Sequence, residues 1–569
     1  MVADFQYPTD AKQYKPVNDS IYDFGEFDFI IVGSGSTGSV IANRLTEVEN
    51  FTVLLVEAGS YANDFVRIPG MSGDVLLLNE FNWFYRTVPQ KTICLGKRVS
   101  HLVLIFRRGK GIGGTSLLNG LVYSRGTPES YNRIAAMGNP EWSYEQVLPY
   151  FKKLENFHKN VKNVQVENDY HGFEGLVNVE YFPTNRHTTE LFVEAAQTIG
   201  YKSIDYNGPN FAGASVVHAV HKNGQRWDAG RAYIEPILNR TNLNISTNSY
   251  VTKILIDPNS NRADGVQFSK DRRLYQAVAR KESGVGPKTH LQQVGIPIVH
   301  ELEVGSTFRD QPGMYGLYFV TNYSDPNVVK GQREKLAEYV KGFGLLGTSG
   351  SDALMFASFN QSSPQPDIEL EMTYLDPNDA YRKTFYYNNE TWNAIWNGTD
   401  GSKAFTIQTI LLFPKSTGSI RLKSNDPYEY PLIDPKQLSD EKNIDIEKLY
   451  QGVQLALKLV DSKPFRSVDA KFINRTLPAC AEHEYLSKDY WLCYIRHTSY
   501  ADNHFQGTNS MGPDPEKGAV VDSRCRVHGI RKLRVADASI FPFTVANHPN
   551  APCMMVGERV SDLIKQDYL

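Results

Sequence analysis

Two histidines near the end of this chain stand in segments rich in turn-forming residues. His504 lies in "DNHFQGTNSMGPD" and His548, forty-four residues later, lies in "VANHPNAPCM". Because an imidazole exchanges its proton near neutral pH, such a pair is suited to acid–base catalysis. The plain alternatives are a hydrogen-bonded surface pair or two unrelated core residues.

Other chemistries fit the surrounding residues less well. Cys480, His483 and Cys493 do not supply a convincing set of zinc ligands, so no metal site is predicted. The segment "GTSGS" at 347–351 approaches the GxSxG pattern of serine hydrolases but lacks its last glycine. Acid–base work in a redox site is the remaining interpretation.

The elements that must position these histidines begin with a strand, a turn and a helix. The apolar run 28–32 predicts a buried parallel strand, residues 40–47 a helix, and residues 52–56 a second buried strand. This order, within about thirty residues, has the length of a βαβ crossover.

The turn carries the GxGxxG pattern of dinucleotide-binding proteins. Gly33 permits the turn, Gly35 admits a pyrophosphate close to the backbone, and Gly38 lets the helix pack on the strand. Ser36, between Gly35 and Gly38, is also expected to contact the cofactor. Glu57, nineteen residues past the last glycine, can accept hydrogen bonds from both ribose hydroxyls. An ordinary βα turn with an incidental glutamate is the alternative.

A second glycine-rich segment, "RRGKGIGGTSLLNG" at 107–120, favours FAD over NAD. Consecutive small residues form an anion-binding concavity of main-chain N–H groups. Arg108 and Lys110 add positive charge, and Asn119 adds an amide. Two separate elements that approach phosphates suit a cofactor lying extended through the domain, as FAD does.

Three stretches together resemble the glucose–methanol–choline (GMC) family of flavin oxidoreductases. They are "DFIIVGSGSTGSVIANRL", "RGKGIGGTSLLNGLVYSRG" and the C-terminal "NHFQGTNSMGPD" to "NHPNAPCMMVGERVSDLI". The resemblance covers about residues 26 to 565. The stretch "IPGMSGDVLLLNEFNWFYRTVPQ" is similar to the insect branch, which includes glucose-dehydrogenase-like proteins and leaf-beetle salicyl alcohol oxidases.

The resemblance implies an α/β fold, α+β overall, in which a Rossmann-like FAD-binding domain is interleaved with an antiparallel-sheet substrate domain. An N-terminal arm would cover residues 1–25 and the FAD-binding domain 26–320, with part of the substrate domain inserted. The substrate-binding domain would cover 321–480, and residues 481–569 would return to the FAD-binding domain with the catalytic histidines.

The resemblance also implies cofactor contacts. The ADP half of FAD would meet Gly33, Gly35, Gly38 and Glu57, its pyrophosphate and ring would meet Gly113, Gly114 and Asn119, and a late contact would come from Asp537 and Ala538. A helix opening at Asn550 would aim its positive N-terminus at the flavin pyrimidine. Phe106 stands where some relatives carry a tethering histidine, so FAD is expected to be non-covalent.

His504 matches the family's catalytic histidine and His548 its second catalytic position. The resemblance implies that His504 takes the hydroxyl proton of a small primary alcohol, aromatic or terpenoid, while hydride passes to flavin N5. His548 would hold the substrate oxygen and stabilise its alkoxide character. An aldehyde would leave, and oxygen or a quinone would accept the electrons.

The chain departs from the family pattern between residues 282 and 283. In "YQAVARKESGVGPKTHL" a strand, a turn and a helix that relatives carry are absent. Their loss removes buried area worth ~25 cal/mol per Å² and leaves ladder partners unpaired. A catalytically inactive paralogue or splice variant with impaired FAD binding is therefore the alternative function, and a flavin-containing lyase is a third. Gln311 also stands where a histidine is common.

Length, charge and composition limit the partners and the compartment that this chain can have. The 569 residues carry a net charge of −3 without a basic block, so neither nucleic acid nor a membrane is an expected partner. No apolar run approaches the ~20 residues of a membrane span, which predicts a soluble protein. Five cysteines allow one or two disulfides and leave an odd thiol, and nine Asn-x-Ser/Thr sequons favour secretion, although residues 1–20 lack a signal-peptide pattern. We expect secretion if a leader precedes this sequence and a cytoplasmic location otherwise.

Overall fold

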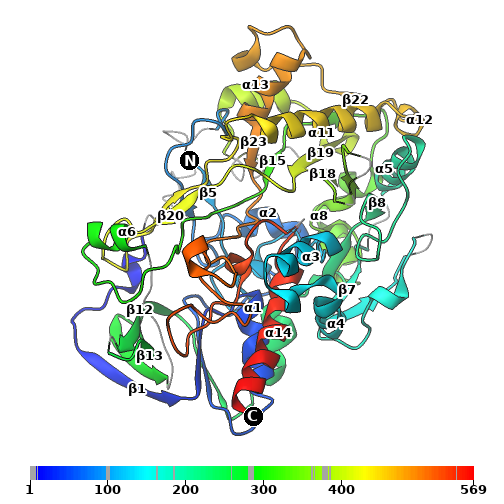
Figure 1. The fold of residues 1–569 in the computed structure, drawn as a ribbon. Helices are drawn as coiled ribbons and strands as arrows, with labels where there is room; N and C mark the ends of the chain where they lie inside the picture. The colour runs from blue at the N-terminus through cyan, green and yellow to red at the C-terminus, as the bar shows by residue number, and fades with distance from the viewer. Residues whose placement is uncertain are drawn as a thin grey trace.

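The computed structural model describes residues 8, 10–97, 103–161, 164–183, 186–257, 259–279, 287–360, 363, 365–374, 382, 386–545 and 548–569. The departure from the family pattern between residues 282 and 283 lies outside these described residues. The fold is mixed α/β, as predicted, and is built from several sheets with helices packed on them (Figure 1).

A parallel three-stranded sheet forms the centre of the predicted nucleotide-binding unit. Its order is β11 (Leu243–Ser246), β3 (Val53–Val56) and β2 (Phe29–Val32). Helix α1 (Ser36–Leu45) follows β2, and the C-terminal α14 (Asn550–Tyr568) lies beside it, as the blue and red helices of Figure 1 show. The predicted strand–turn–helix–strand unit is confirmed, with the helix starting at the glycine turn itself.

Strand β2 is an edge strand among the described residues. It pairs with β3 alone, whereas β3 is buried along its whole length between two neighbours. Val32, the last residue of β2, is 52% exposed. The prediction that 28–32 is a buried strand is therefore wrong in its burial, because no described strand covers its second edge.

A second sheet brings the N-terminal segment against the middle of the chain. Its order is β1 (Ile21–Phe27), β14 (Arg273–Ala279), β13 (Arg262–Lys270) and β12 (Ser249–Asp257), with β1 parallel to β14 and the other pairs antiparallel. Residues 21–25, placed in the predicted arm, thus belong to a strand.

The largest sheet is antiparallel. Its strands are β22 (Lys471–Phe472), β16 (Tyr318–Val320), β19 (Ala404–Leu411), β18 (Ile368–Thr373), β17 (Ser351–Ala357) and β8 (Gly213–Val216), with β15 (Pro312–Met314) and β23 (Ser499–Ala501) joined through β19. The antiparallel sheet predicted between 343 and 423 is confirmed. Its strands come from distant parts of the chain, so the two folding units interleave.

Three helices cover this sheet and bury its hydrophobic side chains. They are α5 (His187–Thr198), α11 (Ile444–Val460) and α13 (Lys488–Thr498). Figure 1 shows α11 running across the top of the molecule. Cys493, within α13, forms a disulfide with Cys480, while Cys94, Cys525 and Cys553 are free thiols.

The remaining elements are short or lie between these layers. A fourth sheet has the order β10 (Gln225–Arg226), β9 (His218–Lys222), β7 (Val177–Tyr181), β6 (Glu155–His158), and two ribbons pair β4 (Tyr85–Arg86) with β5 (Ile105–Phe106) and β20 (Ser419–Arg421) with β21 (Leu432–Asp434). The other α-helices are α2 (Ser72–Val75), α3 (Pro128–Ala136), α4 (Tyr144–Leu154), α6 (Lys288–Gln293), α7 (Pro326–Val329), α8 (Gln332–Val340), α10 (Asn389–Ile395) and α12 (Lys463–Arg466). In the described part of the chain, every helix is too short or too polar to span a bilayer.

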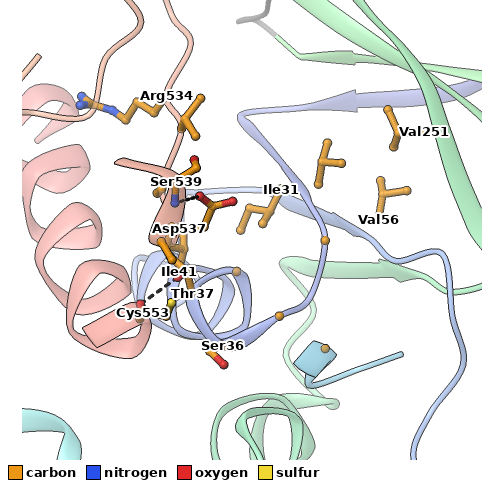
Figure 2. A pocket seen from close by; sticks show the side chains of 18 of the residues that line it. Ile31, Ser36, Thr37, Ile41, Val56, Val251, Arg534, Asp537, Ser539 and Cys553 are labelled. Carbon is orange, nitrogen blue, oxygen red and sulfur yellow. Dashed lines mark hydrogen bonds between the residues drawn. The ribbon is translucent and has the colours of Figure 1, made fainter. Parts of the chain in front are cut away.

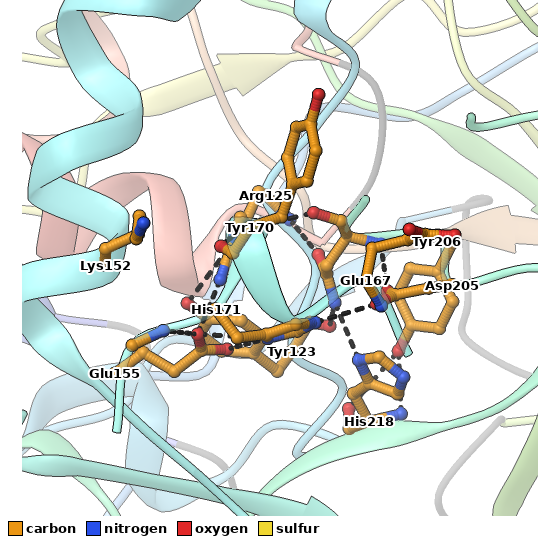
Figure 3. Close-up of polar contacts among 12 residues, drawn as sticks. Tyr123, Arg125, Lys152, Glu155, Glu167, Tyr170, His171, Asp205, Tyr206 and His218 are labelled. Carbon is orange, nitrogen blue, oxygen red and sulfur yellow. Dashed lines mark hydrogen bonds and ion pairs between the residues drawn. The ribbon is translucent and has the colours of Figure 1, made fainter. Parts of the chain in front are cut away.

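A buried ionic network connects the fourth sheet to the loop after the second glycine segment (Figure 3). His171 Nε2 lies 2.8 Å from Asp205 Oδ2, and its Nδ1 lies 3.1 Å from Glu155. Arg125 Nη2 donates to the same Glu155 carboxylate at 2.6 Å. Although burial disfavours the charged imidazole, the hydrogen bonds to Asp205 and Glu155 raise the pKa of His171 above its ordinary value.

Candidate active site

His504 stands in the loop after β23, and its backbone is fixed to the segment before β15. Its N–H donates to Asp310 Oδ1 at 2.7 Å, and the same oxygen accepts from the N–H of Gln311 at 2.9 Å. The irregular backbone around His504 is thus satisfied by a buried carboxylate. Burial, and then the charge of Asp502, raise the pKa of Asp310 well above its ordinary value.

The hydrogen bonds around His504 settle which ring nitrogen carries the proton. Its Nδ1 lies 2.7 Å from Gln311 Oε1, and Gln311 Nε2 donates to the carbonyl of Leu412 at 3.0 Å. Because that second bond uses the amide nitrogen, Gln311 presents its oxygen to the histidine. Nδ1 must therefore be the donor, and Nε2 of a neutral His504 keeps a lone pair for a substrate proton.

Asp502 places a negative charge beside the same nitrogen. Its Oδ2 lies 3.0 Å from His504 Nδ1, and its other oxygen accepts a hydrogen bond from the Tyr315 hydroxyl. Burial favours the neutral acid, but His504 and His548 together lower the pKa of Asp502 below its ordinary value.

His548 meets His504 edge to face and is held by a different carboxylate. The ring centroids are 4.7 Å apart at an interplanar angle of 76°. His548 Nε2 lies 3.0 Å from Oε1 of Glu369, on β18. Burial opposes a charged imidazole, but the Glu369 carboxylate outweighs it and raises the pKa of His548 to about 9.

Glu371 lies two residues further along β18 and so faces the same side of the sheet. Burial raises the pKa of Glu371 to about 7, although the nearby His548 favours its ionised form. The two histidines therefore have different surroundings. The carboxylate of Glu369 favours the charged form of His548, while Nε2 of His504 has no hydrogen-bond partner among the described residues.

A cavity of about 1090 Å³ leads from the glycine turn to the loop of His504. The predicted cofactor residues in its wall are Gly33, Gly35, Ser36, Gly38, Glu57, Arg108, Gly114, Asp537 and Ala538. Those outside the wall are Gly113, Asn119 and Asn550. The wall reaches Phe505, next to His504, but neither catalytic histidine lines the cavity.

The two glycine segments touch, although nearly eighty residues separate them in sequence. Gly113 donates its N–H to the Ser34 carbonyl at 2.9 Å. A Cβ on Gly114 would lie 2.6 Å from Gly35 Cα, and Gly114 has φ of +55°. Only glycine allows this approach, so both predicted phosphate-binding segments lie at one place.

The space at the start of α1 fits a phosphate. A Cβ added to Gly35 would meet nothing within 4 Å, whereas one added to Gly38 would lie 2.0 Å from the Gly33 carbonyl oxygen. Gly35 thus faces open room and Gly38 packs the helix on the turn, as predicted. No side chain caps the first N–H groups of α1, which remain available to an anion.

The N-terminus of α14 also offers a donor. Asn550 Oδ1 accepts from the Ser36 hydroxyl at 2.6 Å, while its buried Nδ2 has no hydrogen-bond partner among the described residues. A buried amide donor without a partner is costly, and a bound polar group that reached it past Ser36 would satisfy it. Asn119, by contrast, uses its Oδ1 to accept from Arg226 at 2.8 Å.

Glu57 joins the two glycine segments. Its Oε2 accepts from the N–H and hydroxyl of Ser34, at 2.9 and 2.7 Å, and its Oε1 accepts from Gly59 and Gly111, at 2.8 and 3.0 Å. These four donors fill the acceptor positions of a carboxylate. A ribose hydroxyl would have to share them, so the ribose contact of Glu57 stays a prediction.

The same cavity continues along the free edge of β2. Phe29 to Val32 line one side and residues 533–537 the other. Figure 2 shows Val56 and Val251 at one end of this space, with Arg534 and Asp537 opposite. This part of the cavity, which we call the β2-edge gap, follows from the lack of a described strand beside β2.

Phe106 is buried in β5, with its ring centroid 4.5 Å from that of Phe505. A phenyl ring has no nucleophilic atom, so this position offers no covalent tether. Sequence reasoning missed Glu369 and Glu371 and gave Asp502 no role. The segment "IELEMT" held a signal, because two glutamates spaced by two in an apolar strand must share one buried face.

Comparisons with known proteins agree on the class of fold. Two family models, both described as GMC oxidoreductase, match residues 27–311 and 414–557. Glucose dehydrogenase (FAD, quinone) of Drosophila pseudoobscura pseudoobscura is 33% identical, covering 95% of this chain and 87% of that protein. Ecdysone oxidase of Bombyx mori is 30% identical, covering 97% and 83%. A crystal structure of formate oxidase superposes with a TM-score of 0.82 at 22% identity, covering 96% and 99%.

Proposed function

This chain belongs to the GMC oxidoreductase family and is an FAD-dependent oxidoreductase acting on CH–OH donors, and we propose that it oxidises a small primary alcohol to the aldehyde. The observation that carries the proposal is the pair of histidines at a centroid distance of 4.7 Å: His504 has no partner for its Nε2 among the described residues, and His548 is paired with the Glu369 carboxylate. We propose an aromatic or terpenoid alcohol as the substrate class.

The two histidines divide the work on the alcohol oxygen. His504 Nε2 accepts the hydroxyl proton, because its Nδ1 already donates to Gln311. His548, protonated below a pKa of about 9, donates to the same oxygen and stabilises the negative charge that develops there. Bound FAD supplies the acceptor for the hydride that leaves the carbinol carbon. Oxygen or a quinone then takes the electrons.

We propose that FAD is held non-covalently. Gly35 and the start of α1 would take the pyrophosphate, and the unpartnered amide of Asn550 would donate to the bound group. The buried Phe106 at the candidate tethering position supports this.

A catalytically inactive member with impaired FAD binding is the second candidate. The β2-edge gap favours it, because the wall beside the nucleotide end of the cavity is incomplete among the described residues. Both histidines and their carboxylates favour the active enzyme, because an inactive protein would not need a buried proton-exchanging pair.

The test is the visible absorbance of the purified protein before and after anaerobic addition of salicyl alcohol. We expect a flavin spectrum that bleaches. A yellow protein that resists bleaching with a panel of aromatic and terpenoid alcohols would exclude the proposed substrate class and leave the lyase alternative. A colourless protein that stays colourless after incubation with FAD would establish the inactive alternative.

We also propose that the protein is secreted. The Cys480–Cys493 disulfide supports an oxidising compartment. The asparagines of all nine sequons are exposed, as glycosylation requires; they are Asn18, Asn50, Asn239, Asn244, Asn322, Asn360, Asn389, Asn397 and Asn474.

A further inference from the structure

We propose that Asp502 and Gln311 have separate positioning roles at His504: Gln311 fixes the tautomer, and Asp502 compensates the charge that the ring acquires. The inference deepens the proposed function and rests on it. Neither residue would touch the alcohol. Both act on the nitrogen of His504 that faces away from the reacting atoms.

Gln311 is suited to select the tautomer because its amide cannot turn over freely. Rotation of the amide would break the 3.0 Å hydrogen bond to the Leu412 carbonyl and would place an NH₂ group against His504 Nδ1. Gln311 is fully buried, so water cannot replace the lost bonds. The amide carries no net charge, however, and cannot balance an imidazolium.

Asp502 supplies that balance. Its Oδ2 lies 3.0 Å from His504 Nδ1, while the ring's hydrogen bond runs to Gln311. The carboxylate thus acts through its charge more than through a directed bond. A charge at this distance in a buried site acts far more strongly than in water. The Tyr315 hydroxyl donates to its other oxygen and keeps the carboxylate in place.

Other charged groups surround the pair and must be weighed with it. Asp310 holds the backbone of His504, and Arg108 Nη1 donates to the carbonyl of Asn503 at 3.2 Å. His548 faces the ring from the other side, with Glu369 at 3.0 Å from its Nε2. Glu371 lies on the same strand as Glu369, close enough for its charge to interact with His548. Because His548 already has its own carboxylate partner, Asp502 is the acid that the geometry assigns to His504.

The proton balance follows from these positions. The alcohol proton forms a new N–H bond at His504 Nε2 as the O–H bond breaks, and hydride leaves with the electron pair of the C–H bond. The ring is then positive between a neutral amide and a carboxylate. Asp502 lowers the energy of this charged state, so the base accepts the proton more readily.

The test compares Asp502→Asn with Gln311→Met in the flavin-loaded enzyme, by the pH profile of kcat/KM. Asp502→Asn keeps the shape and removes the charge; we expect kcat/KM at the optimum to fall about 10- to 100-fold and the acidic limb to move down by about one pH unit. Gln311→Met removes the acceptor and keeps the charge, so kcat/KM should fall without movement of that limb. Asp514→Asn, an exposed aspartate of the same loop, is the matched control and should leave the profile unchanged.

A second readout does not depend on turnover. In protein with isotope-labelled histidine, the NMR signal of the His504 ring is identified as the one that disappears in His504→Gln. This signal should titrate at lower pH in Asp502→Asn than in the unaltered chain. If the signal moves but no alcohol bleaches the flavin, the charge partner stands and the proposed function fails. If alcohol bleaches the flavin while neither the signal nor the acidic limb moves, the role of Asp502 is overturned and the function stands.

Discussion

Oε1 of Glu369 lies 3.0 Å from Nε2 of His548, and this pair makes the two active-site histidines chemically unequal. A buried carboxylate stabilises the charged imidazole of His548, whose pKa rises to about 9. His504 instead donates Nδ1 to the uncharged amide of Gln311, while the Asp502 carboxylate lies 3.0 Å from the same nitrogen without taking that hydrogen bond. One site can thus hold a proton donor and a proton acceptor at the same pH.

Replacing Glu369 with Gln should move the alkaline limit of the reaction. Without the carboxylate, burial disfavours the charged imidazole, so His548 should lose its proton near or below neutral pH. We expect kcat/KM at pH 8 to fall about 10- to 100-fold, with partial recovery toward pH 6. The measurement is the pH profile of kcat/KM with an alcohol that bleaches the flavin.

Glu371→Gln is the matched control, because a carboxyl with a pKa of about 7 is largely protonated on the acidic side of neutrality. The amide resembles that neutral form, so kcat/KM below pH 7 should change less than threefold. Equal losses in the two variants would show that burial of the strand, not the ion pair, sets the charge of His548.

The same ion pair should make the folded protein lose stability as the pH rises. The pKa of His548 is raised from 6.5 to about 9 on folding, so its contribution is complete below pH 6.5 and is lost as the pH passes through about 9. A shift of this size corresponds to roughly 3 kcal/mol, discounted somewhat for partial exposure. The difference in Tm between pH 7 and pH 9.5 should therefore be smaller in Glu369→Gln than in the unaltered chain.

The two glycines of the turn should respond differently to the same substitution. Gly35→Ala adds a Cβ that meets no protein atom within 4 Å, so the fold should persist while the pyrophosphate loses its room. We expect a Tm of the apoprotein within a few degrees of normal and at least tenfold weaker FAD binding by absorbance titration.

Gly38→Ala, in contrast, would place a Cβ 2.0 Å from the Gly33 carbonyl oxygen. The helix and turn would have to separate, so the apoprotein itself should be destabilised by about 1–3 kcal/mol. If both variants lost FAD binding and lost the same amount of stability, Gly35 could not serve only the pyrophosphate and Gly38 the packing of the helix on the turn.

Local pattern was enough to predict the glycine turn, the strands beside it and the antiparallel substrate sheet, because each rests on spacing within a few residues. The contacts of His504 could not be predicted in this way. Asp502 lies two residues before His504, but Gln311 is almost two hundred residues away in sequence, and the pairing of β15 with β23 brings it to the histidine. The burial of 28–32 was misjudged for a similar reason, since an edge is a property of the whole sheet.

The proposed secretion predicts that the protein carries N-linked glycans, whose mass adds to that of the polypeptide. Expressed through a eukaryotic secretory pathway, the protein should lose several kilodaltons on enzymatic removal of N-glycans, because all nine sequon asparagines are exposed. The Cys480–Cys493 peptide should appear linked in non-reducing mass spectrometry. Unglycosylated protein with both thiols free, recovered from its native source, would contradict secretion.

The network around His171 should be the part of the fold that least tolerates a single change. Replacing this fully buried imidazole with Ala leaves Asp205 and Glu155 without its charge, and breaking a buried pair in this way costs about 3–5 kcal/mol. His187, an exposed histidine 3.7 Å from Glu190, is the matched control, and its replacement should cost less than about 0.5 kcal/mol. The measurement is urea denaturation of both variants.

Because the pKa of His171 is raised on folding, its contribution to stability is complete below the unfolded pKa of 6.5 and fades as the pH rises through the folded value. The cost of His171→Ala should therefore shrink between pH 6 and pH 9, and a cost that stays constant over that range would mean that His171 contributes only packing.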